Sequence, residues 1–534
     1  KKKKTPLRTT TSAGDVTFAA TNGSSTITVT DASHGAATND FVTFSGASSL
    51  GGNVTAAVLN QEYQILLVTG TNTYTITAKD TSGATVTANA SDSGNGGSSV
   101  VGAYQINVGL DVYVEGSGWG AGTWGAGTFG SVSPISSSSQ LRLWSHDNFG
   151  EDLVLNPRGG GVFYWDESSG TSQRAVALTA LSGSNKAPTV ALQVLVSDID
   201  RHVLCFGADP LNADNLRTSA SDPLLIAWSD QENVTQWEPL PNNTAGSLRL
   251  SAGSSIIGAV RARQETLVWT DTSLYSLTFV GQPFTFGVNL INEGVGLIGP
   301  NAAVNSPKGI FWMDKKGFYT YNGAVQDIPC SVQNYVFSDL NEGQAFQVFG
   351  FLNKEFDEVG WYYCSENATS IDKYVVYNYG EGTWTIGEMT RSSWIDEGIF
   401  NNPMATYTEP SGTGYLYNHE TGNDDDGSPM DNVFIESSDF ALGSGEQFQS
   451  ISRIIPDVKF TGNGGSDQTI NFVLKQRNFP GESLATDSTN TCTATTTKID
   501  TRLRARQAAL RIESDDDNSL GARLGVGFRV FFFF

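Results

Sequence analysis

The chain has 534 residues, too many for one ordinary hydrophobic core, so we expect two or more domains. Its 55 acidic and 32 basic residues give a net charge of −23, which argues against a protein that grips nucleic acid. The aromatic content of 11% excludes a disordered tail, and no apolar run approaches the roughly 20 residues that a membrane-spanning helix needs.

Short segments in which apolar and polar residues alternate predict an all-β protein. Residues 25–30 and 73–77 alternate in this way, and clusters of Gly, Asn, Asp and Ser interrupt such segments about every ten residues. Helical periodicity is almost absent. Residues 502–511 also alternate, and we predict a strand there with its arginines facing outward.

The N-terminal part of the sequence divides into three segments. We expect residues 1–14 to be a disordered or poorly assigned head, without a signal peptide because no apolar stretch follows the lysines. Residues 15–108 are rich in Thr, Ser, Ala and Gly, and they predict a small, self-contained β domain. Within residues 109–139 an aromatic residue followed by Gly-Ala-Gly-Thr recurs, which indicates either an ordered arm or a flexible hinge.

Tryptophan recurs at regular intervals between residues 140 and 425. An apolar run ends in Trp with an acid close behind, and successive tryptophans are separated by 63, 41, 43 and 49 residues. A β-bearing repeat of roughly 40 to 50 residues is typical of a β-propeller, in which a large aromatic packs between neighbouring blades. We predict about five to seven blades, with a β-sandwich as the alternative. The tryptophans assigned to the propeller core are Trp165, Trp228, Trp269, Trp312, Trp361 and Trp384.

An acidic residue follows four of these tryptophans directly or after one residue. Such an acid can accept hydrogen bonds from the amides of a turn. We therefore expect these side chains to close the hairpins of the blades. They are Asp166, Asp230, Asp271 and Asp314.

The last part of the chain, residues 426–534, predicts a C-terminal β platform or β-sandwich. Strands are expected over residues 448–455, 468–474 and 508–512. We expect strands at the start of the segment 140–425, ahead of the propeller, to complete this platform.

The sequence lacks the motifs of common catalytic, cofactor and metal sites. It has no G-x-S-x-G elbow, no P-loop and no H-E-x-x-H pair, so we predict a protein that is not an enzyme and has no cofactor. The cysteines lack zinc spacing, and reduced thiols are the simpler interpretation. The dispersed histidines and cysteines are His34, His146, His202, His419, Cys205, Cys330, Cys364 and Cys492.

Two local segments superficially match known sites. Residues 423–427 are acidic, but Gly422 occupies the first ligand position of a calcium loop and no Glu occupies the twelfth, so we expect a solvated acidic loop. Sialidases, which are propellers, carry S-x-D-x-G-x-x-W turns. Residues 229–237 come nearest to that turn and lack its central Gly.

Two sets of stretches stand out: residues 141–166, 228–237, 263–275, 294–300 and 311–319, and, within the small domain, residues 30–35, 40–46 and 59–65. The first set, in this order along the chain, resembles the tail nozzle proteins of short-tailed bacteriophages, also called tail hub or tail tubular B proteins. That resemblance covers residues 140–420 well and the C-terminal region loosely. The second set resembles β domains spliced into many phage tail proteins.

The resemblance implies a structural protein of the virion tail. It implies a ring, usually of six copies, that lies below the portal and its adaptor, contacts tail fibres or a tail needle, and continues the DNA-ejection channel. A strongly acidic ring would repel DNA and let it slide. A loop near the exit would act as a gate that retains the DNA, and the acidic residues Asp424, Asp425 and Asp426 are the candidates for it.

Two other classes of function stay open. A propeller that binds or cleaves glycans would use its aromatic residues to stack on sugars. A bacterial surface adhesin would use residues 15–108 as a stalk, although no wall anchor is visible in the sequence.

Overall fold

The computed structural model describes most of the chain in two compact units, residues 1–419 and 420–534. Nearly all of the regular structure is β-strand, as the sequence predicts. Among the described residues, no helix is both long and apolar enough to span a membrane. The described residues are 5–38, 40–91, 95–106, 108–110, 112–113, 140–197, 200–408, 414–421, 433–441, 444–460, 469–479, 481–514, 522–524 and 529–532.

The first 106 residues contain a small β domain made of two four-stranded antiparallel sheets, with strand orders β1-β8-β4-β5 and β2-β3-β7-β6. Its own hydrophobic core lies between them, and Ile27 and Val29 are buried where alternation predicted inward-facing residues. The elements are β1 (Leu7–Thr10), β2 (Thr17–Ala20), β3 (Thr26–Thr30), β4 (Phe41–Ser45), α1 (Ala56–Leu59), β5 (Glu62–Gln64), β6 (Leu67–Gly70), β7 (Thr73–Thr77) and β8 (Val101–Gln105).

The expectation of a disordered head is wrong for residues 7–10. They form strand β1, which pairs antiparallel with β8 of the small domain. The Arg8 guanidinium also donates a hydrogen bond of 2.9 Å to the carbonyl oxygen of His34. The β8 edge therefore supplies backbone partners that the composition of the head did not reveal.

Six consecutive antiparallel sheets follow in the described residues between 144 and 418, five with four strands and the last with three. Each is a meander in chain order, as in propeller blades. The strands are β9 (Trp144–Phe149), β10 (Asp152–Pro157), β11 (Phe163–Trp165), β12 (Val176–Ala177); β13 (Gln193–Val196), β14 (Val203–Phe206), β15 (Leu225–Trp228), β16 (Gly246–Arg249); β17 (Ile256–Arg261), β18 (Thr266–Thr270), β19 (Ser273–Gly281), β20 (Thr285–Glu293); β21 (Ala303–Ser306), β22 (Gly309–Met313), β23 (Phe318–Tyr321), β24 (Val325–Ile328); β25 (Phe349–Asn353), β26 (Glu358–Tyr363), β27 (Lys373–Asn378), β28 (Thr383–Glu388); and β29 (Ser393–Ile395), β30 (Met404–Thr408), β31 (Gly414–Asn418).

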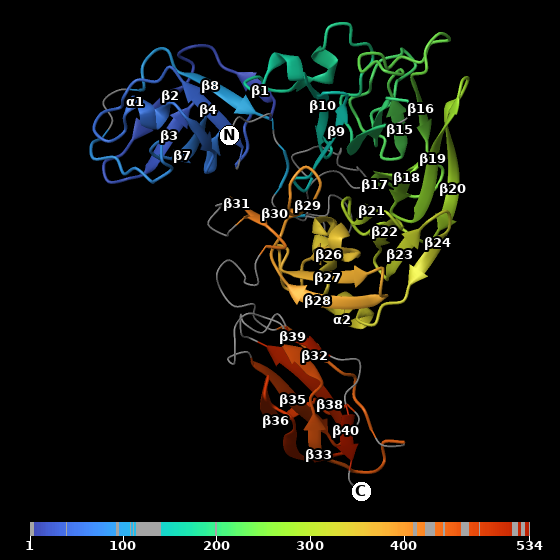
Figure 1. The fold of residues 1–534 in the computed structure, drawn as a ribbon. Helices are drawn as coiled ribbons and strands as arrows, with labels where there is room; N and C mark the ends of the chain where they lie inside the picture. Colours follow the sequence, from blue (N-terminus) through green and yellow to red (C-terminus); the bar gives the residue numbers. More distant parts are fainter. Residues whose placement is uncertain are drawn as a thin grey trace. The chain divides into compact units, whose positions relative to one another are not determined.

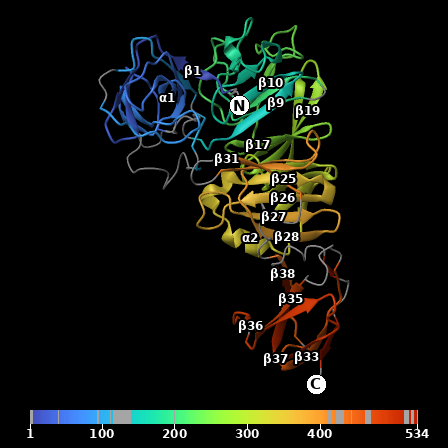
Figure 2. The ribbon, with the colours of Figure 1, turned by 60° about the vertical axis from the view of Figure 1, so that its left-hand side comes forward.

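The blades succeed one another in space in the order of the chain. Figure 1 shows the sheets following each other from β9 and β10 to β26–β28, and Figure 2 shows β25 to β28 side by side in one sheet. The first strands of successive blades, β9, β13, β17, β21, β25 and β29, are neighbours. This is the arrangement of a β-propeller, whose innermost strands face one another. Short helices lie between strands: η2 (Glu167–Ser169), η3 (Leu178–Ala180), α2 (Gln333–Asp339), η4 (Glu342–Gln347) and η5 (Lys354–Phe356).

The second unit is a β-sandwich. A four-stranded sheet, β32-β38-β35-β36, and a three-stranded sheet, β37-β33-β40, share one core in which Ile451 and Leu503 meet Phe472 and Leu510. A two-stranded sheet pairs β34 with β39. The strands are β32 (Val433–Glu436), β33 (Gln449–Ile455), β34 (Val458–Phe460), β35 (Thr469–Arg477), β36 (Ala485–Thr493), β37 (Ile499–Ala505), β38 (Gln507–Ser514), β39 (Ala522–Leu524) and β40 (Arg529–Phe532).

Two details of this unit differ from expectation. Within the described residues, every strand of its sheets comes from after residue 432, whereas β9 and β10, which precede the remaining blades, form the first blade and do not complete the platform. Residues 502–511 form two strands in different sheets, because the chain crosses from β37 to β38 at Arg506. Arg502 and Arg504 do face outward, as the alternation predicts.

Candidate functional site

The six tryptophans assigned to the propeller core all lie on blade strands, but at different positions in their blades. Trp269, Trp312 and Trp361 occupy the second strands of three successive blades and are fully buried. Trp165 and Trp228 lie on third strands, β11 and β15. Trp384 lies on the fourth strand of the fifth blade, β28. A strict structural repeat therefore covers only the third, fourth and fifth blades.

Aromatic rings join these three blades. The rings of Trp269 and Trp312 meet edge to face with their centroids 5.4 Å apart. Phe318 of the fourth blade lies 4.9 Å from Trp361 and 4.6 Å from Trp384, both in the fifth blade. Large aromatic side chains thus pack between neighbouring blades, where burial of ring surface contributes most to their adhesion.

Two indole nitrogens of the fifth blade donate hydrogen bonds to the fourth blade, whereas those of Trp269 and Trp312 are buried without a hydrogen-bond partner in the described part of the chain. Trp361 Nε1 donates to the carbonyl oxygen of Ala302 at 2.9 Å, and Trp384 Nε1 donates to that of Pro329 at 2.9 Å. Both carbonyls flank the fourth blade, which precedes the blade of the donors. Trp228 behaves differently, because its Nε1 donates a hydrogen bond of 2.8 Å to the carbonyl oxygen of Thr244, beside the last strand of its own blade.

A seventh tryptophan with the same role was missed from the sequence. Trp394 lies on β29, and its Nε1 donates a hydrogen bond of 2.8 Å to the carbonyl oxygen of Leu352 in the preceding blade. An acid follows two residues later, Asp396, which is the spacing of Trp269 and Asp271. That spacing is the signal that would have identified it.

The acids after the tryptophans bond backbone amides, but not always those of the next turn. Asp166 Oδ1 accepts from the amide of Ser168 at 2.9 Å, and the Ser168 hydroxyl bond lowers the pKa of this carboxyl. Asp230 Oδ1 instead accepts from the amide of Thr244 at 2.8 Å. Asp271 Oδ1 accepts a hydrogen bond of 2.7 Å from the amide of Ser254. Ser254 lies before β17, the first strand of the same blade.

The described residues contain no group of three or more His, Cys, Asp or Glu side chains arranged to hold a metal ion. All four cysteines are free. Burial raises the pKa of the Cys330 thiol to about 11 and that of Cys364 to about 12, so both are protonated at neutral pH. The turn 229–237 is structural: Ser229 Oγ accepts from the Val203 amide at 3.0 Å, and Trp237 is buried.

Asp424, Asp425 and Asp426, the predicted gate residues, lie outside the described residues, as does the glycine-aromatic repeat 118–130. Their predicted roles therefore stay predictions.

Large apolar side chains are exposed on or beside edge strands of both units, which the sequence did not indicate. In the first unit, Phe284 is 75% exposed in the turn between β19 and β20, and Leu416 is 60% exposed on β31, the edge of its sheet. In the second unit, Ile435 is 55% exposed on β32, also an edge strand. Exposed apolar edges invite pairing with another chain, so these strands are candidate assembly surfaces.

Comparisons with known proteins give distant likenesses only. No protein-family model and no curated protein sequence matches the chain. A mutant of the Synechocystis apocarotenoid oxygenase is 8% identical, with a TM-score of 0.29 over 77% of this chain and 88% of that one. The phage phi92 endosialidase is 10% identical, with a TM-score of 0.19 over 87% of this chain and 65% of that one. The CNH domain of AfRom2 is 9% identical, with a TM-score of 0.26 over 50% of this chain and 90% of that domain. A further match to the same Synechocystis oxygenase, in another mutant, covers 65% of that chain.

Proposed function

We propose that this chain is a structural protein of a bacteriophage tail, the nozzle ring that continues the DNA-ejection channel below the portal and its adaptor. The exposed apolar edge strands of both units carry the proposal. A free chain with such edges is prone to aggregate, whereas an assembly would bury them against neighbouring subunits. The sequence resemblance to tail nozzle proteins selects this assembly among the possible ones.

The charge of the chain suits a conduit for DNA. A wall that neutralised phosphates would release counterions and hold the duplex tightly. A net charge of −23 on each subunit would repel the duplex and leave few positions at which it sticks. In this role the protein has no cofactor and catalyses no reaction.

The joints between blades suit a wall that must keep its shape. Between the third and fifth blades they consist of packed rings and indole hydrogen bonds to backbone carbonyls. Such contacts depend little on salt, whereas exposed ion pairs are screened at physiological ionic strength. The joints would therefore hold in a virion that meets dilution and varied salt.

The proposed partners are further copies of the chain, in a ring of six, the adaptor protein above and tail fibres or a tail needle. The proposed location is the virion tail. The test is the mass of the complex released from purified tails, measured by light scattering. A closed ring of about six subunits supports the proposal, and a stable monomer in the assembled particle contradicts it.

A glycan-binding role is the second candidate, because three tyrosines share one face of the last blade. Tyr407 and Tyr415 pair across β30 and β31, and their rings stack with centroids 6.3 Å apart. Tyr417 lies 6.1 Å from Tyr415, also stacked. Such a platform can stack on sugar rings. A glycan array and a reducing-end release assay test this role. If no glycan binds on the array and no reducing ends are released, the role is excluded.

A further inference from the structure

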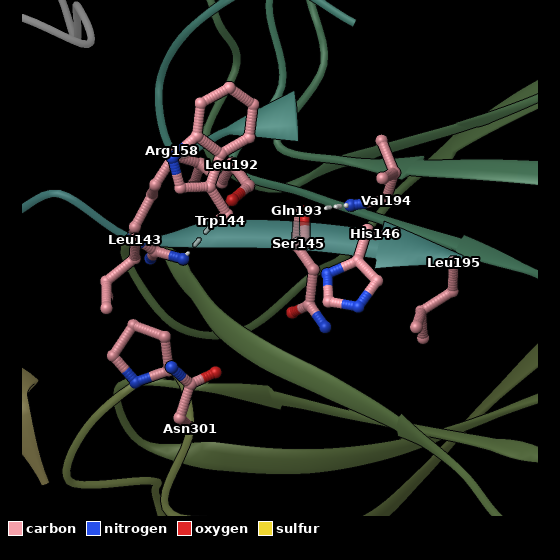
Figure 3. A pocket seen from close by; sticks show the side chains of 11 residues that line it. Leu143, Trp144, Ser145, His146, Arg158, Leu192, Gln193, Val194, Leu195 and Asn301 are labelled. Atoms are coloured by element: carbon pink, nitrogen blue, oxygen red, sulfur yellow. Dashed lines mark hydrogen bonds between the residues drawn. The ribbon is translucent and has the colours of Figure 1, made fainter. Parts of the chain in front are cut away.

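A cavity of about 200 Å³ lies among the first strands of the blades. Residues of β9 and β13 line it, together with Pro300 and Asn301, which lie shortly before β21. Because the first strands of a propeller face its middle, this cavity belongs to the inner part of the propeller. Figure 3 shows Arg158, His146, Gln193 and Asn301 arranged around it.

Arg158 is a buried cation beside this cavity. Arg158 is only 4% exposed, and it forms no ion pair with a carboxylate among the described residues. Its Nη1 and Nη2 reach the carbonyl oxygens of Leu192 and Ile256 at 3.5 and 3.3 Å, which are long hydrogen bonds. Its Nε is buried without a hydrogen-bond partner in the protein.

The surroundings of Arg158 hold the guanidinium in place without neutralising it. The guanidinium lies over the ring of Phe346, 5.5 Å from its centroid. The ring of Tyr113 packs against the same Phe346 ring, with the two centroids 4.4 Å apart. Burial lowers the pKa of Arg158 to about 10, so the side chain is still charged at neutral pH. A buried charge without a counterion is costly, and the cost falls when an anion binds beside it.

The other polar side chains around the cavity are suited to an anion. The Asn301 amide and the His146 imidazole can donate hydrogen bonds. The side-chain amide of Gln193 already forms two hydrogen bonds with Ala259. Its Nε2 donates to the Ala259 carbonyl oxygen at 2.7 Å, and its Oε1 accepts from the Ala259 backbone amide. None of the residues that line the cavity is Asp or Glu.

We propose that this cavity binds a small oxyanion, with Arg158 as its cation and Asn301 and His146 as further donors. The volume accommodates a phosphate or a short carboxylate, and it is below the size typical of cavities for large organic ligands. The bound ion would link strands of the first, second and fourth blades. This proposal does not depend on the tail role, and either can fail without the other.

The test is thermal unfolding of the full chain at constant ionic strength, with chloride replaced by inorganic phosphate in one arm and by acetate in the other. A ligand of the folded state raises Tm in proportion to the logarithm of its concentration. We expect at least one of the two anions to raise the Tm of the native sequence. The anion that does so distinguishes a phosphate site from a carboxylate site.

Two variants and one control assign the effect. Arg158→Met keeps the length of the side chain, and we expect it to weaken anion binding at least about tenfold. Arg249→Met removes a 57% exposed arginine that pairs with Asp222, and we expect it to bind like the native chain. If Arg158→Met does not fold, Asn301→Leu replaces it, with a weakening of roughly fivefold expected for one lost hydrogen bond.

Three outcomes would overturn the proposal. The first is that neither anion raises the Tm of the native chain. The second is that both anions raise the Tm of Arg158→Met as much as that of Arg249→Met, which indicates a general salt effect. The third is Asn301→Leu binding the anion as tightly as the native chain when Arg158→Met is unfolded.

Discussion

Asp147 on the first blade and Arg261 on the third form an ion pair of 3.3 Å that passes beside the first strand of the second blade. The same carboxylate accepts a hydrogen bond of 2.8 Å from the amide of Val196 at the end of β13. The guanidinium of Arg261 also donates to the carbonyl oxygen of Val196 at 3.3 Å. Two side chains thus tie together the first strands of three consecutive blades.

We predict that Asp147→Ala destabilises the propeller by about 2 kcal/mol, because it leaves the Val196 amide and the Arg261 cation without this carboxylate. Chemical denaturation of the first unit measures the change. Arg249→Ala breaks a surface ion pair and is the control, with a loss below about 1 kcal/mol expected. Equal losses in the two variants would show that Asp147 contributes no more than an ordinary surface charge.

Trp361→Phe and Trp384→Phe form a matched pair, because both indoles donate to a carbonyl at 2.9 Å. Trp361 is fully buried and Trp384 only partly. We expect Trp361→Phe to cost about 2 kcal/mol, since the Ala302 carbonyl loses the shorter of its two hydrogen bonds out of reach of water and the smaller ring leaves a cavity. Trp384→Phe should cost less, because water can replace the indole. The free energies of unfolding of the two variants check this order, and the reverse order would refute it.

Acid should destabilise the propeller through two histidines. Burial lowers the pKa of His202 to about 4, and burial together with the Arg391 cation lowers that of His419 to about 4. A histidine in the unfolded chain titrates near 6.5, so the unfolded state binds more protons between pH 6.5 and 4. Stability is therefore present above pH 6.5 and is lost as the pH falls toward 4.

The variants His202→Gln and His419→Gln test this linkage. Each should flatten the dependence of Tm on pH in that window, because each removes one group whose protonation favours unfolding. An unchanged slope in both variants would mean that carboxylates alone determine the acid sensitivity.

The exposed edge strands should matter for assembly and not for folding. Ile435→Lys on β32 and Phe284→Ser at the β19–β20 turn change side chains that are largely exposed, so the Tm of the free chain should shift little. We expect at least one of them to prevent incorporation into tails in a complementation assay. Leu216→Lys, which changes a 53% exposed residue outside the strands, is the control and should assemble normally. Normal assembly of both test variants would remove the edge strands as contact surfaces.

The sequence predicted the strands well where burial alternates. Residues 73–77 form β7 as expected, and residues 26–30 of the alternating segment 25–30 form β3. The Trp-acid pattern indicated the blades because a tryptophan on a blade strand recurs with an acid close behind it, whose side chain accepts hydrogen bonds from backbone amides. It did not give the strand number, since Trp228 ends the third strand of its blade while Trp269 lies on the second.

The contacts between distant segments were not predictable from one sequence. Arg158 follows a strand in a turn rich in glycine, and contacts with residues far along the chain, Leu192, Ile256 and Phe346, surround its guanidinium. The crossing at Arg506 is equally hidden: the alternation breaks at the adjacent polar residues Arg506 and Gln507, but that break does not say which sheet the next strand joins. Pairing between segments far apart in the chain decides both features.

The most direct measurement of the proposed tail role is a density map of the assembled particle at a resolution that identifies side chains. We expect this chain to form a closed ring around the tail axis, with acidic side chains dominating the wall of the channel. A position away from that axis, or a channel wall crowded with lysine and arginine, would contradict it.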